Sequence, residues 1–195
     1  MMSPMFRYFL GFQVPVDRAG WLARQLPPVT GDLFAGLKPQ NYHLTLCTIA
    51  ETMMPHPFLR QQVARALGAD LPAASAIPFG RIQSRETGAE LVTAGSVAAI
   101  RQLYEAVVAR LATQAIEPMH RKSGLRPHIT LGYGACDFDP VPLAWHWTPG
   151  DLVLIESHVG HRRHRVLQSW TLPPPVQGAF DFMADDLPPP LLRAA

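Results

Sequence analysis

Cysteine is scarce in this sequence, with Cys47 and Cys136 as the only two among 195 residues. Secreted domains that depend on disulfide bonds carry several cysteines at short spacings, and two cysteines so far apart do not form that pattern. The sequence is therefore not that of a disulfide scaffold. We expect both cysteines to be free thiols and the protein to be cytoplasmic.

Long hydrophobic runs and an excess of charge of one sign are also missing. A membrane-spanning helix needs about 20 consecutive apolar residues, whereas the apolar stretch at residues 1–14 is shorter and is interrupted by Arg7 and Gln13. The 17 basic residues nearly balance the 15 acidic ones, which leaves a net charge of +2. We predict no membrane partner, and any contact with nucleic acid should be local.

Hydrophobic residues make up 48% of the chain, which is enough for a substantial core. Proline is abundant, with 20 residues, and it gathers into two runs at 173–175 and 188–190. Because proline gives no backbone donor to a sheet and ends helices, these runs favour an extended tail. The sequence predicts one folded domain at residues 1–172, followed by a proline-rich tail at residues 173–195.

Alternating and helical patterns of apolar residues predict an α+β fold. Alternation typical of strands occurs at residues 6–14, 41–49, 77–83, 90–94, 127–133, 145–147, 151–159 and 165–172. Helical spacing occurs at residues 17–26, 57–67 and 96–115, and Ser96 is in position to cap the last of these helices. This order of strands and helices fits two similar halves.

Two short segments repeat one pattern of residues. Residues 41–46 read Asn-Tyr-His-Leu-Thr-Leu, and residues 126–131 read Arg-Pro-His-Ile-Thr-Leu. With 8 histidines and 10 threonines in the sequence, chance placement predicts about 0.4 occurrences of His-x-Thr. In each segment, strand alternation turns the histidine and the threonine to the same face. We infer a duplicated functional motif.

The paired motifs suit the cleavage of a phosphodiester. That reaction needs a base to activate the nucleophile and an acid to protonate the leaving oxygen, and histidine serves both roles near neutral pH. Thr45 and Thr130 would place hydroxyl donors beside a phosphate oxygen. The alternative is that His43 and His128 are half-buried structural residues, but their duplication favours catalysis. Cys47 shares the predicted face of His43 and should only line the cleft floor.

A first strand at residues 7–15, the two motifs and a long helix between them resemble the two-histidine (2H) phosphoesterase superfamily, in its family of 2'-5' RNA ligases and RNA 2',3'-cyclic phosphodiesterases. The resemblance spans residues 6–172. It implies a bilobal, duplicated α+β fold, in which two antiparallel sheets flanked by helices surround a central cleft. It also implies hydrolysis of RNA-type 2',3'-cyclic phosphates to 2'-phosphates, with 2'-5' RNA ligase activity in many members.

The resemblance further implies roles for individual residues. His43 would be the general acid toward the leaving 3' oxygen, and His128 would be the base that activates water. Thr45, Thr130 and Arg126 would hold the phosphate. No cofactor and no metal is implied. The expected partners are RNA ends or small nucleotides with a 2',3'-cyclic phosphate or a 2'-5' linkage, and we expect a monomer.

Several further residues have two interpretations each. Arg126 could bind the phosphate or could fix its strand by pairing with a carboxylate. Phe9, Phe12 and Tyr42 could stack on a nucleobase, although aromatic residues of strands more often belong to the core.

A segment rich in arginine and histidine lies near the end of the predicted domain. Its basic cluster could grip an RNA backbone, but a solvated hairpin turn is the favoured interpretation; the cluster consists of Arg162, Arg163 and Arg165, with His161 and His164 between them. His158, His161 and His164 are spaced by threes, which aligns side chains on a helix and not on a hairpin. We therefore predict no metal site there.

Other functions compatible with the motifs stay open. The same pair of histidines could serve a 2'-5' oligonucleotide phosphodiesterase or a nucleotide-sugar cyclic phosphodiesterase. A non-catalytic RNA-binding protein is a further alternative, which the intact histidines and threonines disfavour.

Overall fold

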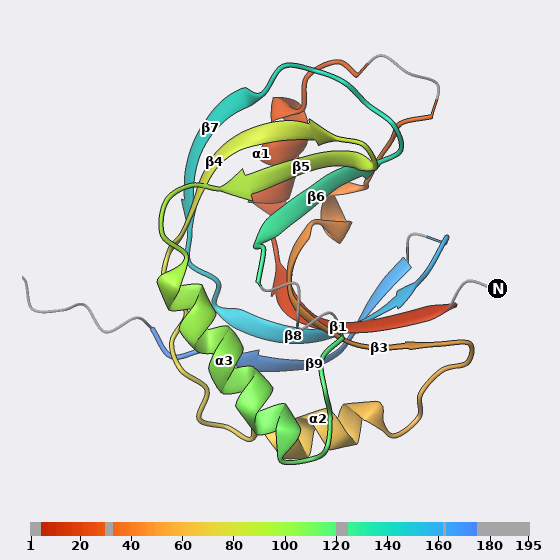
Figure 1. The fold of residues 1–195 in the computed structure, drawn as a ribbon, viewed down its shortest axis with the longest axis vertical. Coiled ribbons are helices and arrows are strands. Elements are labelled where there is room, and N and C mark those ends of the chain that lie inside the picture. Colours follow the sequence, from red (N-terminus) through yellow and green to blue (C-terminus); the bar gives the residue numbers. More distant parts are fainter. Residues whose placement is uncertain (1–4, 30–32, 120–124, 162, 175–195) are drawn as a thin grey trace, which may run out of the picture.

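The computed structural model describes residues 5–29, 33–119, 125–161 and 163–174. In chain order these residues form β1 (Phe6–Gln13), α1 (Val16–Gln25), β2 (Ala35–Gly36), the 3-10 turn η1 (Pro39–Asn41), β3 (His43–Thr52), α2 (Leu59–Leu67), β4 (Ile77–Arg85), β5 (Gly88–Thr93), α3 (Ala98–Ala112), β6 (His128–Tyr133), β7 (Val141–Trp147), β8 (Asp151–His158) and β9 (Arg163–Thr171). The α+β prediction is confirmed (Figure 1). The predicted tail lies outside the described residues, apart from Pro173 and Pro174.

The described strands form one hydrogen-bonded order, β7-β4-β5-β6-β3-β1-β8-β9, and β2 pairs with β6 from outside this path. All of the pairs are antiparallel. The prediction of two separate sheets is corrected here, because Leu44 of β3 pairs with Ile129 of β6 and links the two groups of strands. We call β7, β4, β5, β6 and β2 the upper half, and β3, β1, β8 and β9 the lower half (Figure 1).

Among the described strands, one residue pair joins the two halves, and it lies within the two His-x-Thr motifs. Leu44 and Ile129 are the middle residues of those motifs, and both side chains are fully buried. Because the pairing is antiparallel, His43 extends toward Thr130 and Thr45 extends toward His128. Side chains alternate along a strand, so these four residues share the face opposite the buried Leu44 and Ile129.

The helices cover the other side of the strands and build the core. In α2 the buried residues follow the spacing of one helical face, namely Leu59, Val63, Ala66 and Leu67. α2 packs against α3 and β9 below the lower half, and α1 meets the upper half, where Trp21 lies edge-on to Trp145 with ring centroids 6.2 Å apart (Figure 1). One buried cluster runs through both halves. No helix in the described part of the chain is long and apolar enough to cross a membrane.

Most of the predicted elements are present with shifted ends. The helix expected at residues 96–115 is shorter, and the backbone N–H of Ala98 donates to the hydroxyl of Ser96 at 3.3 Å. The strand expected at residues 145–147 begins earlier, at Val141, because it pairs along β4. β2 and η1 were not predicted, since each is too short to show a period.

Candidate active site

A pocket of about 330 Å³ lies between the two halves and contains both motifs. His43 and Thr45 reach it from β3, and His128 and Thr130 reach it from β6. The structure therefore brings together four residues that are far apart in the sequence. The rest of the lining consists of Arg7, Phe9, Thr48, Thr87, Gly88, Glu90, Gly132, Tyr133, Ser157 and His164.

The two histidines are held in the same way. Nδ1 of His43 lies 2.7 Å from the backbone oxygen of Asn41, and Nδ1 of His128 lies 2.8 Å from the backbone oxygen of Arg126. A carbonyl oxygen only accepts, so Nδ1 must carry the proton in both rings. Nε2 of each ring is then the atom that takes up or releases a proton. In both motifs the anchor is the residue two positions before the histidine.

His43 sits in a cluster of three rings. Its imidazole stacks on Phe9, with centroids 4.6 Å apart and planes inclined by 27°, and meets His164 edge-on at 4.9 Å. Phe9 and His164 also contact each other, at 5.9 Å. The pKa of His43 is lowered to about 4, mainly by burial and to a lesser extent by the nearby His164 and His128, while the hydrogen bond to Asn41 acts to raise it. Burial also lowers the pKa of His164.

His128 has a carboxylate for a neighbour instead. Oε1 of Glu90 lies 3.9 Å from Nε2 of His128, and Arg126 binds the same carboxylate with both terminal nitrogens, at 2.7 and 3.0 Å. Arg85 approaches it at 3.5 Å. Burial acts to raise the pKa of Glu90, but the hydrogen bonds from Arg126 and the charges of His128, Arg126 and Arg85 outweigh burial and lower it. Glu90 is therefore a nearly buried, ionised group.

This arrangement occurs on a fold that is known from other proteins. TT0787 of Thermus thermophilus superimposes with a TM-score of 0.68 and 19% identity, over 87% of this chain and 99% of that one. A structure described as a phosphoesterase gives 0.64 and 19%, over 88% and 99%. E. coli LigT in complex with 3'-AMP gives 0.63 and 20%, over 88% and 99%.

The chain shares the fold of these three structures. The similarity that the two motifs predicted is thus found at the level of the fold. No family model matches the sequence, and no curated protein is similar to it.

Within this fold, an irregularity of β3 changes which residues face the pocket. Leu10 of β1 pairs with Cys47, whereas the next residue, Gly11, pairs with Thr45, so Leu46 is an extra residue on β3. The alternation is shifted by one beyond this point, and Thr48 lines the pocket in place of Cys47. The prediction that Cys47 lines the cleft floor was wrong. Cys47 belongs to the core, where burial raises the pKa of its thiol to about 12.

The three aromatic candidates for base stacking take different positions. Phe12 and Tyr42 are 1% and 2% exposed and belong to the core, so they offer no ring face to a ligand and that interpretation is corrected for both. Phe9 lines the pocket, but one face of its ring is already occupied by His43. Phe9 thus supports His43 in this pocket.

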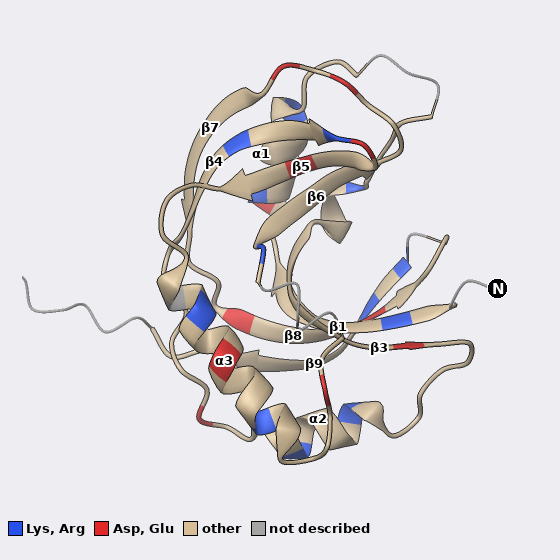
Figure 2. Cartoon of the chain, in the orientation of Figure 1, with Lys and Arg blue, Asp and Glu red and all other residues tan. Residues whose placement is uncertain are grey.

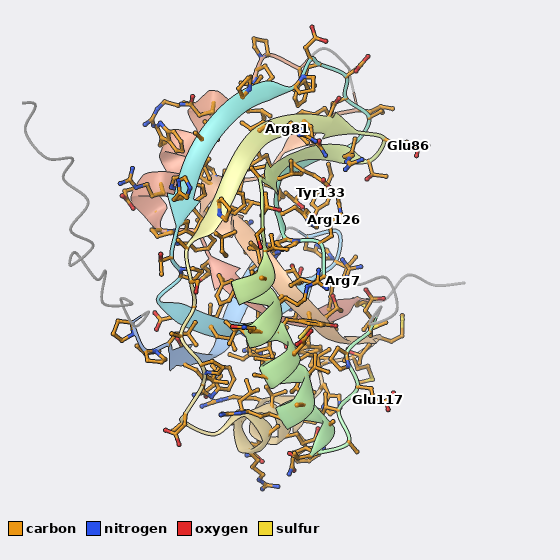
Figure 3. The ribbon with its side chains drawn as sticks, turned by 60° about the vertical axis from the view of Figure 1, so that its left-hand side comes forward. Arg7, Arg81, Glu86, Glu117, Arg126 and Tyr133 are labelled. Atoms are coloured by element: carbon orange, nitrogen blue, oxygen red, sulfur yellow. The ribbon has the colours of Figure 1, made fainter. Side chains whose placement is uncertain are left out.

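Arg126 pairs with the carboxylate of Glu90. Of the two roles considered from the sequence, this is the one that fixes its strand. Figure 3 shows Tyr133, Arg126 and Arg7 following one another, in this order, along the same side of the molecule. Arg7 and Tyr133 line the pocket, and Arg7 is paired with Glu51 at 2.6 Å.

Glu90, His164 and Thr48 were not predicted for the site. Glu90 has no motif of its own, and only its pairing with Arg126, which is distant in the sequence, identifies it. His164 was assigned to a solvated hairpin, yet it reaches His43. His158 instead contacts Phe6 and Glu156 and does not line the pocket, so the histidines spaced by threes are not gathered. Among the described residues no group of three His, Cys, Asp or Glu side chains could hold a metal ion.

Proposed function

We propose that this protein is a metal-independent phosphodiesterase that hydrolyses RNA-type 2',3'-cyclic phosphates to 2'-phosphates, with 2'-5' RNA ligase activity as the related joining reaction. The observation that carries the proposal is the matched geometry of the two motifs. Each histidine is fixed through Nδ1 by the backbone two residues earlier, and each has its threonine beside it in one pocket. A phosphate between the two strands would meet an imidazole and a hydroxyl from either side.

The surroundings of the two histidines favour the reverse of the roles that the resemblance implies. With its pKa lowered to about 4, His43 is neutral at neutral pH and ready to accept a proton from water. His128 faces the carboxylate of Glu90 through Nε2, and this contact is attractive only when Nε2 carries a proton. We therefore assign the base to His43, which burial keeps neutral, and the acid to His128, whose Nε2 faces the carboxylate of Glu90.

The chemistry follows from these positions. His43 removes a proton from the attacking water as the oxygen forms its bond to phosphorus, and His128 gives its proton to the ribose oxygen that leaves. The hydroxyls of Thr45 and Thr130 donate hydrogen bonds to the non-bridging oxygens, where negative charge grows in the transition state. To give a 2'-phosphate, the 3' oxygen of the ribose must lie on the side of His128.

The proposal is tested with adenosine 2',3'-cyclic phosphate in excess EDTA. We expect His43→Ala and His128→Ala each to lower kcat/KM by at least about a hundredfold, as for general acid and base groups. His146→Ala is the matched control, because His146 is an exposed histidine of a strand that does not line the pocket. Full activity of either variant, or a wild type that works only with an added divalent ion, contradicts the proposal. Phosphorus NMR identifies the product as the 2' or the 3' isomer.

The same variants separate the acid from the base. Bis(p-nitrophenyl) phosphate has a leaving group that departs without a proton, so loss of the general acid matters little for it. We expect His128→Ala to recover most of its activity on this substrate and His43→Ala to stay inactive on both. The opposite pattern would make His43 the acid and His128 the base, as the resemblance implies. Catalysis by the pair of histidines would still stand.

A further inference from the structure

A second, larger cavity adjoins the pocket at His164. It has a volume of about 780 Å³, and His164 is the residue that lines both spaces. On the other side of His164 the cavity is bounded by the start of β9 and by the segment that leads into β3, including Arg163 and Lys38. Spaces of this size accommodate a nucleotide or a small ligand. A molecule held at His43 could therefore continue past His164 into this cavity.

The charges in this cavity are not balanced. Its one carboxylate, Glu156, is buried and already occupied: Arg165 lies 3.0 Å from it and His158 3.6 Å, while the Tyr8 hydroxyl donates to it at 2.9 Å. Figure 2 shows basic positions at the start of β9. Lys38 and Arg163 line the same cavity, and neither has an ion-pair partner among the described residues. Two cations are thus left for an anion from outside.

The segment with Arg163 is held in place by that buried network. The backbone N–H of His56 donates to the Tyr8 hydroxyl at 2.8 Å, and this hydroxyl donates to Glu156, which pairs with Arg165. By strand alternation, residues 163 and 165 lie on the face of β9 opposite to His164, which reaches His43. All three residues line the cavity, which therefore extends around the edge strand β9. The sequence offered two interpretations of this segment, a solvated hairpin turn and a basic cluster that binds an RNA backbone, and both can therefore hold.

We infer that this cavity is a second anion site, which binds the phosphate on the 5' side of the nucleotide whose cyclic phosphate is opened. The inference rests on the proposed function, since it assumes that the reacting phosphate lies between His43 and His128. A nucleotide that ends in a 2',3'-cyclic phosphate carries any further phosphate on its 5' side, so Lys38 and Arg163 would meet that group. The substrate class is then 5'-phosphorylated nucleotides or RNA ends, and not bare nucleosides with a cyclic phosphate.

Binding of product-like probes tests this site without any turnover. Isothermal titration compares 2'-AMP with adenosine 2',5'-bisphosphate, which differ by one 5' phosphate. We expect the bisphosphate to bind about tenfold more tightly or better, as for a charge-assisted contact, and the preference to fall with added salt. Arg163→Gln and Lys38→Gln should each reduce the preference toward one. Arg18→Gln, at an exposed arginine of α1 that lines neither cavity, should keep it.

Equal affinity for the two probes in the wild type, or a preference that survives both substitutions, overturns the second site. Turnover of adenosine 2',3'-cyclic phosphate is measured separately, so a protein that prefers the bisphosphate but hydrolyses nothing contradicts the proposed function and not this site. A dinucleotide with a 2',3'-cyclic end distinguishes the two sources of the phosphate. If it is preferred over the 5'-phosphorylated mononucleotide, the site serves RNA ends, and if both are equally good, a terminal 5' phosphate is sufficient.

Discussion

At the scale of single residues, two histidines from the same motif become chemically different. His43 is surrounded by the rings of Phe9 and His164, which desolvate it, whereas His128 faces the ionised Glu90. The sequence predicts the pair, because the His-x-Thr pattern is local and repeated. It could not predict their environments, because Glu90 and His164 come from other strands and carry no motif.

This difference predicts an unusual pH profile of kcat/KM, which reports the ionisation of the free protein. Because burial lowers the pKa of His43 to about 4, its basic form is present above that pH and is lost only as the pH falls through about 4. We expect activity to persist in mildly acidic solution and to fall at higher pH, where no proton is left for the leaving oxygen. The two limbs belong to the coupled pair, so either assignment of acid and base gives the same profile.

The measurement is kcat/KM against pH for the wild type and for Phe9→Ala, whose smaller side chain lets water reach His43. The acid limb should move to higher pH in that variant, toward the ordinary histidine value of about 6.5. A wild-type acid limb already near neutrality would show that His43 is not desolvated in solution. His146→Ala should leave the profile unchanged.

At the scale of elements, the sequence predicts strands well and their irregularities poorly. Alternation identified β3, but the extra residue Leu46 arises from pairing with β1, which no local pattern reveals. This is why Cys47 was placed on the wrong face and Thr48 was missed. Similarly, the link at Leu44 and Ile129 depends on two strands that are distant in the sequence.

Gly11 lies at this irregularity, and a substitution of Gly11 tests it. A Cβ atom on Gly11 would collide with the backbone oxygen of Leu44, the residue next to His43. We expect Gly11→Ala to lower the free energy of unfolding by about 1–3 kcal/mol, because the backbone of β1 and β3 must separate. The free energy is measured by urea denaturation.

Gly20 of α1 supplies the matched control, because a Cβ there would approach only the end of the Arg24 side chain, at 3.8 Å. Alanine favours a helix over glycine by about 1 kcal/mol, so Gly20→Ala should be neutral or stabilising. If both substitutions behave alike, the close approach of β1 and β3 is not present in solution.

At the scale of the whole molecule, the pocket exists because the chain crosses repeatedly between the halves. β1, β3, β8 and β9 of the lower half come from both ends of the described chain, and β4 to β7 of the upper half lie between them. Each half contributes one of the two His-x-Thr motifs, so neither half could form the pocket alone. The sequence predicts two similar halves but does not say whether each folds separately. In the structure, the buried cluster is continuous across both halves.

This continuity predicts a single cooperative unfolding transition. Trp145 contacts both Trp21 and Trp147 in the upper half, and Trp170 lies on β9 of the lower half. Fluorescence therefore reports mainly on the upper half, whereas far-ultraviolet circular dichroism reports on both. The two probes should give the same urea midpoint.

Leu44→Ala, at the buried link, should lower both midpoints together and cost about 2–5 kcal/mol. Val166→Ala on the exposed part of β9 should have little effect. A fluorescence transition that separates from the dichroism transition, in the wild type or in Leu44→Ala, would mean that the halves unfold independently and that the pocket between them depends on docking rather than on one shared core.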